Sequence, residues 1–394
     1  MTDFSPKNRA PASPLHVFLI AGEPSGDRLG AALMAGLKAL APGVAFSGIG
    51  GPAMQAEGME SLFPMEELSV MGLVEVLPKY FHLKRRIRQA AEAALAANPA
   101  ALVTIDSPDF CLRVAALAKS ARPGLRTIHY VAPSVWAWRP GRAAKMARHI
   151  DHVLALLPFE PPWMTAAGMS CDFVGHPVVS EPVAGPEQAR AFREAHGIAP
   201  DAPLVVALPG SRRGEVSRLL PPFGGTLRLV AARLPALRVV LPTPRHLADT
   251  VAEATKDWPG NPVILPAPDL AARTAAFAAA DAALAASGTV SLELAAQSCP
   301  MVIAYDMAAP TLWLMRRMAR IDTVTLVNLV SETRTVPEFI GPDCRAERIA
   351  PALLALLQNG PGPQAEAMEV TMQRLGRGQE PPGLRAARSV LDHL

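Results

Sequence analysis

Apolar runs of strand length alternate with segments of helix length along almost the whole chain. In the first half these runs lie at 15–21, 44–49, 101–105, 126–131, 152–156 and 171–174. A second series lies at 204–210, 237–242, 262–266, 281–287 and 300–305. Such alternation is typical of a parallel sheet covered by helices on both faces. The pattern therefore predicts an α/β protein with two Rossmann-like domains.

The boundary between these domains is expected where both patterns lapse. Proline and glycine accumulate at 175–187, which indicates a linker. We expect an N-terminal domain over 1–180 and a C-terminal domain over 181–363, with their parallel sheets facing a central cleft that holds the ligands. The segment 364–394 has an amphipathic helical pattern, and we expect it to pack back on the N-terminal domain.

Composition narrows the classes of function. The chain has 394 residues, of which 50% are hydrophobic and 19% charged, and a net charge of only +3, so nothing indicates a nucleic-acid partner. No segment approaches the roughly 18 apolar residues of a spanning helix, and 1–14 is polar and proline-bearing, so we expect a cytoplasmic protein. Four scattered cysteines, no histidine cluster and no Asp-x-Asp motif indicate neither a metal site nor another cofactor.

Polar residues follow two of the predicted strands in the first half. The stretch LIAGEPSGDRLG (19–30) is a strand, a polar turn with Glu23, and a helix start that Ser25 or Asp27 could cap. It lacks the glycine order of a dinucleotide fingerprint. In TIDSPDF (104–110), Asp106 directly follows a strand and is a candidate general base, whereas Asp109 is placed to cap the next helix.

Tryptophan and arginine concentrate in HYVAPSVWAWRPGR (129–142), in a chain otherwise poor in aromatic residues. Trp136 could line an acceptor pocket, or it could simply pack in the domain interior, which is the commoner role of a tryptophan.

Two turns in the second half have the chemistry of a nucleotide site. In LPGSRRGEV (208–216), Ser211, Arg212 and a helix N-terminus could hold a diphosphate, although a plain turn with solvated arginines has the same pattern. In ASGTVSLELA (286–295), Ser287 ends a strand and Glu293 could accept the ribose hydroxyls, or be an ordinary helix-surface residue.

One helical stretch, VMGLVEVLPKYFHLKRRIRQAA (70–91), is both apolar and basic. This combination is typical of a helix that lies on an anionic membrane surface, and also of a core helix with a solvated basic face. The residues that would contact lipid are Met71, Leu77, Phe81, Lys84, Arg85, Arg86 and Arg88.

Together the motifs resemble those of the lipid-A-disaccharide synthases. The matching blocks, in the family's order, are AGEPSGD (21–27), GGPAMQAEG (50–58), MEELSVMGLVEVL (65–77), IDSPDF (105–110), HYVAPSVWAWR (129–139), LPFE (157–160), FVGHP (173–177), LPGSRRGEV (208–216), ASGTVSLE (286–293), CPMVIAY (299–305) and LVNLV (326–330). They extend over nearly the whole chain. Pro24 and Arg213 depart from the family's pattern without removing a functional group.

The resemblance implies a B-type glycosyltransferase fold that uses no metal. It implies transfer of 2,3-diacylglucosamine from UDP-2,3-diacylglucosamine to 2,3-diacylglucosamine 1-phosphate, which forms a β-1,6 bond and releases UDP. Carried over by motif, Glu23, Asp106, Arg212 and Asn328 are the functional polar residues, with Asp106 or Glu23 as the base. We expect Ser25, Asp27 and Trp136 on the acceptor side of the cleft. Another UDP-sugar transferase or a UDP-N-acetylglucosamine epimerase of the same fold is the alternative.

The acyl chains of both substrates explain why the enzyme would need the apolar and basic stretch, which can bind a membrane. We expect the enzyme to associate peripherally with the inner face of the inner membrane, where it would take up lipids. The sequence leaves open the preferred acyl chains and whether the protein is a monomer or a homodimer.

Overall fold

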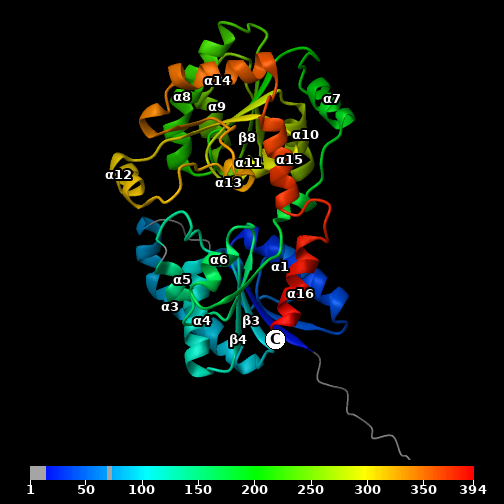
Figure 1. The fold of residues 1–394 in the computed structure, drawn as a ribbon, viewed down its shortest axis with the longest axis vertical. Helices are drawn as coiled ribbons and strands as arrows, with labels where there is room; N and C mark the ends of the chain where they lie inside the picture. The colour runs from blue at the N-terminus through cyan, green and yellow to red at the C-terminus, as the bar shows by residue number, and fades with distance from the viewer. Residues whose placement is uncertain (1–14, 69–72, 140) are drawn as a thin grey trace, which may run out of the picture. The chain divides into compact units, whose positions relative to one another are not determined.

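The computed structural model describes residues 15–68, 73–139 and 141–394. The chain forms two units, Met1–Pro177 with Glu380–Leu394, and Val178–Gln379 (Figure 1). In the described residues each unit contains one six-stranded parallel sheet. This confirms the predicted α/β class with two parallel-sheet domains.

The sheet of the first unit has the strand order β2-β1-β3-β4-β5-β6. The strands are β1 (His16–Ala21), β2 (Ala45–Ile49), β3 (Ala101–Ile105), β4 (Arg126–Tyr130), β5 (His152–Ala155) and β6 (Ser170–Phe173). Side chains along a strand alternate between faces. In β1, Phe18 and Ile20 therefore enter one hydrophobic core, while Val17 and Leu19 enter the core on the other face.

Helices cover both faces of this sheet. They are α1 (Pro24–Leu40), α2 (Pro52–Ala56), α3 (Leu73–Ala97), α4 (Pro108–Ala121), α5 (Gly141–Met146), α6 (Pro161–Thr165) and α16 (Pro382–Asp392), with a 3₁₀ turn, η1 (Met65–Leu68). Buried side chains of α3 and α4 share the core of Phe18, and those of α1 and α16 share the core of Val17.

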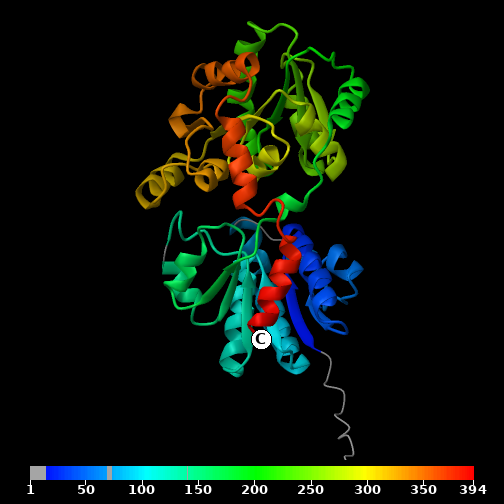
Figure 2. The same ribbon diagram turned by 45° about the vertical axis from the view of Figure 1, so that its right-hand side comes forward.

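The last helix, α16, packs against the first, α1, although they lie at opposite ends of the chain (Figures 1 and 2). Their backbones meet at two glycines. A Cβ atom on Gly36 would lie 2.6 Å from the Gly383 carbonyl oxygen, and one on Gly383 would lie 2.6 Å from that of Ala32. A larger residue at either position would force the helices apart.

The sheet of the second unit has the order β12-β11-β10-β7-β8-β9. Its strands are β7 (Leu204–Leu208), β8 (Arg238–Thr243), β9 (Val263–Pro266), β10 (Ala282–Ala285), β11 (Met301–Tyr305) and β12 (Glu338–Ile340). Its helices are α7 (Pro186–Ala195), α8 (Arg213–Ala231), α9 (Ala248–Ala254), α10 (Leu270–Ala279), α11 (Val290–Ala296), α12 (Ala309–Met318), α13 (Leu326–Ser331), α14 (Ala346–Asn359) and α15 (Gln364–Arg374). The 3₁₀ turns are η2 (Pro177–Ser180), η3 (Arg245–Leu247) and η4 (Gly341–Asp343).

The segment 364–394, which we expected to pack on the first domain as one tail, is divided between the units. Helix α15 packs against α11 and α13 in the second unit, whereas α16 belongs to the first. Among the described helices, none combines the length and the apolar character needed to cross a membrane.

The strand orders locate the ligand-binding edge of each sheet. In the first unit β1 lies between β2 and β3, and in the second β7 lies between β8 and β10. At such a switch point the loops that follow the two central strands diverge and leave a crevice, where ligands of open α/β sheets bind. The predicted site residues Glu23 and Asp106 follow β1 and β3, and Arg212 and Ser287 follow β7 and β10.

Candidate functional site

The switch point of the second unit opens into a cavity of about 490 Å³. It is lined by the loops that follow β7, β8, β9 and β10 and by the first turns of α8 and α11. Four predicted nucleotide-binding residues, Ser211, Arg212, Ser287 and Glu293, all line it. The structure therefore brings together residues that lie as many as 82 positions apart in the sequence.

A carboxylate organises the turn after β7. Glu215, in the first turn of α8, accepts hydrogen bonds at 3.4 Å from the backbone N–H groups of Ser211 and Arg212. Gly210 has φ +109°, and a Cβ atom there would lie 2.8 Å from Glu215 Oε2. This close approach requires glycine. Such a capping box satisfies backbone donors that the first turn of a helix otherwise leaves unpaired.

Arg212 lies over this turn and remains accessible. Its Nη1 donates to Glu215 Oε1 at 3.2 Å, while 65% of the side chain is exposed. The Tyr305 hydroxyl, at the end of β11, donates to the same oxygen at 3.2 Å. Burial, followed by the nearby Glu215 charge, raises the pKa of Tyr305, so this hydroxyl keeps its proton. Glu215 is thus held from two sides, and Arg212 can turn to a ligand without breaking the turn.

The cavity lining contains a second arginine. Arg273 of α10 pairs with Glu293 at 2.6 Å and lies over the ring of Phe277, and Arg273 itself lines the cavity. Ser287 donates to the carbonyl oxygen of Val324 at 3.1 Å. Both acidic residues of the cavity, Glu215 and Glu293, therefore have an arginine partner.

Asn328 lies in the interior of the second unit and does not line this cavity. It is 1% exposed, and its amide donates to Thr323 Oγ1 and to the Val336 carbonyl oxygen, while its Oδ1 accepts from the N–H of Val336. In this arrangement Asn328 ties α13 to the segment before β12.

In the first unit, the turn between β3 and α4 has an unusual backbone. Asp106 and Ser107 have φ +52° and +42°, the left-handed region that non-glycine residues seldom adopt. The N–H of Asp106 is held by the Tyr130 carbonyl oxygen at 2.9 Å. Ser25, from the turn after β1, donates to Asp106 Oδ2 at 3.4 Å.

Glu23 and Asp106, the two candidate bases, both affect the pKa of the buried thiol of Cys111. Burial raises the pKa of the Cys111 thiol, and the charges of Asp106 and Glu23 raise it further. Glu23 follows β1 and Asp106 follows β3, so both residues lie at the carboxyl ends of neighbouring strands of the first sheet.

Asp27 has a different place from the one we predicted. Neither it nor Ser25 caps α1, which begins at Pro24 after Glu23. Asp27 is 4% exposed and accepts hydrogen bonds from the N–H groups of Gly51, Ala53 and Met54 at 2.8 to 3.0 Å. It thus caps α2. This contact joins the GEPSGD and GGPAM motifs and fixes the loop after β2.

Trp136 is 9% exposed and packs inside the first unit. Its indole N–H donates to Glu160 Oε1 at 3.2 Å, and its ring meets Phe159 edge-on. The other carboxylate oxygen of Glu160 accepts from the N–H groups of Leu156 and Leu157. Burial raises the pKa of Glu160 to about 7. The geometry favours the packing role that the sequence left open for Trp136.

Residues 73–91 of the basic stretch lie in the long helix α3. The Phe81 side chain is 81% exposed, and Lys84, Arg85 and Arg88 are exposed as well. Arg86 points elsewhere, because it forms a two-point ion pair with Glu67 and covers the Phe63 ring. Met71 and the side chain of Leu77 lie outside the described residues.

Known proteins resemble this chain in sequence and in fold. A family model described as lipid-A-disaccharide synthetase matches residues 17–383. This chain belongs to that family. A lipid-A-disaccharide synthase of Ruegeria pomeroyi is 62% identical, with 96% of each chain covered. Another, from Rhodospirillum centenum, is 50% identical and covers 96% of this chain and 94% of its own.

Solved structures show the same fold at low identity. The UDP-GlcNAc 2-epimerase of Neisseria meningitidis, bound to UDP-GlcNAc, has a TM-score of 0.62 at 11% identity and covers 96% of this chain and 98% of its own. MurG of Acinetobacter baumannii has a TM-score of 0.56 at 14% identity, with coverages of 96% and 99%. The predicted B-type glycosyltransferase fold is confirmed.

Family membership confirms the predicted enzyme class, a glycosyltransferase that forms the lipid A disaccharide. The epimerase alternative is not favoured, since the relatives that match along the whole chain at high identity are synthases.

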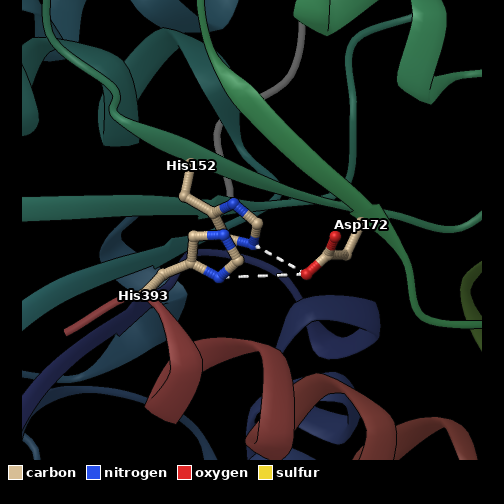
Figure 3. Close-up of side chains that lie close together, drawn as sticks. All are labelled: His152, Asp172 and His393. Carbon is tan, nitrogen blue, oxygen red and sulfur yellow. Dashed lines mark ion pairs between the residues drawn. The ribbon is translucent and has the colours of Figure 1, made fainter.

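The first unit of this synthetase-family protein also contains a cluster with the residue types of a metal site. His152, Asp172 and His393 lie together at the end of α16 (Figure 3). Asp172 Oδ2 is 3.7 Å from His152 Nε2 and 3.8 Å from His393 Nδ1. The imidazole rings stack at 3.7 Å with planes 16° apart.

The hydrogen bonds of this cluster point to a structural role. His393 Nδ1 lies 2.8 Å from the Ser389 carbonyl oxygen, which can only accept, so this nitrogen carries a proton. A ring nitrogen that carries a proton has no lone pair to offer a metal ion. Instead His152 Nε2 donates to Ser389 Oγ, which donates to Asp172 at 2.6 Å. This network ties α16 to β5 and β6.

Proposed function

We propose that the protein transfers 2,3-diacylglucosamine from UDP-2,3-diacylglucosamine to 2,3-diacylglucosamine 1-phosphate, with release of UDP. The observation that carries the proposal is the cavity at the β7–β10 switch point, where Ser211, Arg212, Ser287 and Glu293 come together. A nucleotide sugar occupies the epimerase of Neisseria meningitidis, which has this fold.

In this proposal the second unit binds the donor nucleotide. Arg212 and the hydroxyl of Ser211 line the cavity, and they can donate to the diphosphate. Glu293 accepts from the ribose hydroxyls, while Arg273 fixes its position. As the bond between the sugar and the diphosphate breaks, negative charge grows on the leaving group. Arg212 stabilises that charge.

The first unit binds the acceptor and supplies the base. Inversion at the anomeric carbon requires in-line attack by the acceptor 6-hydroxyl, which loses its proton as the new bond forms. We assign this proton to Asp106, whose carboxylate is held by a constrained turn and by Ser25. Glu23 on the neighbouring loop orients the acceptor.

We further propose that the enzyme works at the inner face of the inner membrane. Its substrates carry acyl chains, and α3 presents the exposed Phe81 beside the exposed cations Lys84, Arg85 and Arg88. An apolar anchor with neighbouring positive charge is the combination that binds an anionic bilayer.

The test is UDP release with each lipid substrate alone and with both together. A transferase releases UDP at a substantial rate only when the acceptor is present, and the disaccharide forms in equal amount. UDP release or epimerisation from the donor alone, at the same rate with or without acceptor, would contradict the proposal.

A further inference from the structure

A basic hollow of about 370 Å³ lies on the surface of the first unit, between α4 and α5. Its rim is formed by Arg113 of α4, by Arg142 and Lys145 of α5, and by Arg148 and His149, which follow α5. Of these five residues only Arg142 belongs to a stretch that the sequence singled out (129–142), and neither the donor site nor the acceptor site uses its side chain.

Within the described residues, none of these five side chains makes a hydrogen bond or an ion pair with another protein group. Asp151 is the next acidic residue along the chain after His149. It pairs with Lys119 at 2.6 Å and accepts a hydrogen bond from the N–H of Thr127. Asp109, one turn before Arg113, is exposed and pairs with none of them. Four permanent positive charges thus surround one hollow without compensation, and a bound anion would relieve their mutual repulsion.

The floor of the hollow is apolar. It consists of Leu112 and Ala116 of α4, Pro133 after β4, and Met146. One turn along α4, Leu117 is 47% exposed. A small hydrophilic anion would use the rim and leave this floor unoccupied, whereas a phosphate that carries an apolar substituent would use both.

We propose that the hollow binds the phosphate headgroup of an anionic phospholipid, with the arginines and the lysine on the phosphate and the first methylene groups of the acyl chains over the apolar floor. That the ligand is a lipid rests on the proposed function, since an enzyme of acylated substrates works at a bilayer. Helix α3, with the other proposed lipid contact, packs against α4 in the same unit (Figure 1). In this proposal α3 attracts anionic lipid without distinguishing its headgroup, whereas the hollow recognises the headgroup.

The test compares the full-length protein with a double variant, Arg142→Ser with Lys145→Ser. A matched control, Arg228→Ser with Arg233→Ser, removes two exposed arginines from the second unit, where neither has a side-chain partner among the described residues. Vesicles of phosphatidylcholine with and without phosphatidylglycerol are sedimented with each protein. Calorimetry measures binding of dihexanoyl phosphatidylglycerol below its micelle concentration, and of inorganic phosphate.

We expect the hollow variant to bind phosphatidylglycerol vesicles roughly tenfold to thirtyfold more weakly than the control, because each charge near an anionic surface contributes on the order of a fivefold factor. The short-chain lipid should bind the parent and the control but not the hollow variant. Inorganic phosphate should bind none of them measurably.

Equal vesicle binding by the hollow variant and the control would overturn the proposal. So would phosphate binding as tight as that of the lipid, which would indicate a free-anion site. A raised KM for detergent-dispersed acceptor, with unchanged vesicle binding, would make the hollow an acceptor subsite instead. These readouts are separate from the proposed reaction, because a protein that binds the lipid but releases no UDP contradicts only the transferase assignment.

Discussion

Asp106 and Ser107 adopt a backbone conformation that costs about 1 kcal/mol or more at each non-glycine residue. The surrounding contacts must compensate this cost, and one of them is the hydrogen bond from the Asp106 N–H to Tyr130. Strain of this kind accumulates where a side chain must point in one direction for function. At Asp106 the carboxylate is aimed beside Ser25 at the switch point of the first sheet.

Asp106→Asn should therefore lower turnover by roughly 10²–10⁴ without weakening UDP binding, because the amide keeps the shape but cannot accept the proton. Steady-state rates and UDP calorimetry measure the two effects. Glu23→Gln is the comparison. If the Asp106 variant kept near-parental turnover while the Glu23 variant lost it, the base would be Glu23.

Two adjacent arginines offer a matched pair in the second unit. Arg212 lines the cavity, whereas Arg213 is exposed outside it. Arg212→Ala should weaken UDP binding roughly tenfold to a hundredfold, the size of one charged hydrogen bond to diphosphate. Arg213→Ala should change it little. Calorimetry with UDP decides, and equal affinities for both variants would remove Arg212 from the nucleotide site.

At the scale of elements, α16 is fixed by the network around His152. This imidazole is fully buried, and burial, the facing His393 and the more distant Arg126 lower its pKa to about 4, against the opposing effect of Asp172. The folded state therefore keeps His152 neutral where the unfolded chain would take up a proton. The stabilisation is complete above pH 6.5 and is lost as the pH falls toward 4.

Lowering the pH from about 6.5 to about 4 should thus destabilise the docking of α16 by up to roughly 3 kcal/mol. Hydrogen exchange of the α16 amides, corrected for the intrinsic pH dependence of exchange, measures this loss. In His152→Gln, the corrected exchange rates of the α16 amides should not change as the pH is lowered over this range. Parental rates that likewise do not change would show that His152 does not control the docking.

The pattern of apolar runs predicted every strand of the first sheet, because long buried parallel strands consist of continuous apolar residues. It missed β12 (Glu338–Ile340), a three-residue edge strand that is too short to leave such a run. Residues that follow strands, such as Asp106 and Ser287, could also be predicted. The positions of Arg273 and Tyr305 could not, since each depends on contact with a distant element. Asp27 was misplaced for the same reason, because its partners lie in α2.

At the scale of the molecule, the charged residues of the cavity indicate whether the enzyme needs a metal ion for turnover. Each of its carboxylates, Glu215 and Glu293, already pairs with an arginine, and these arginines also face the space where we propose the diphosphate binds. Arginine can neutralise a leaving diphosphate without a divalent ion. Turnover should therefore be unchanged in EDTA. A loss of activity on chelation that magnesium reverses would contradict this expectation.

The exposed residues of α3 permit the final prediction, which separates apolar anchoring from charge. Replacing Lys84, Arg85 and Arg88 by serine should weaken binding to phosphatidylglycerol vesicles and hardly affect the weak binding to neutral ones, because a neutral surface offers the cations no attraction. Phe81→Ser should weaken binding to both, since insertion of the ring depends on apolar burial.

Arg86 provides the control for this experiment. Its guanidinium is held by Glu67 and lies over Phe63, so it faces the interior of the unit and not the exposed side of α3. Arg86→Ser should lower the thermal stability of the protein while vesicle binding stays near the parental value. Co-sedimentation across a salt series provides the measurement, because only the effect of the exposed cations should fade as salt screens them. Equal binding of all variants and the parent at low salt would return α3 to the role of a core helix with a solvated face.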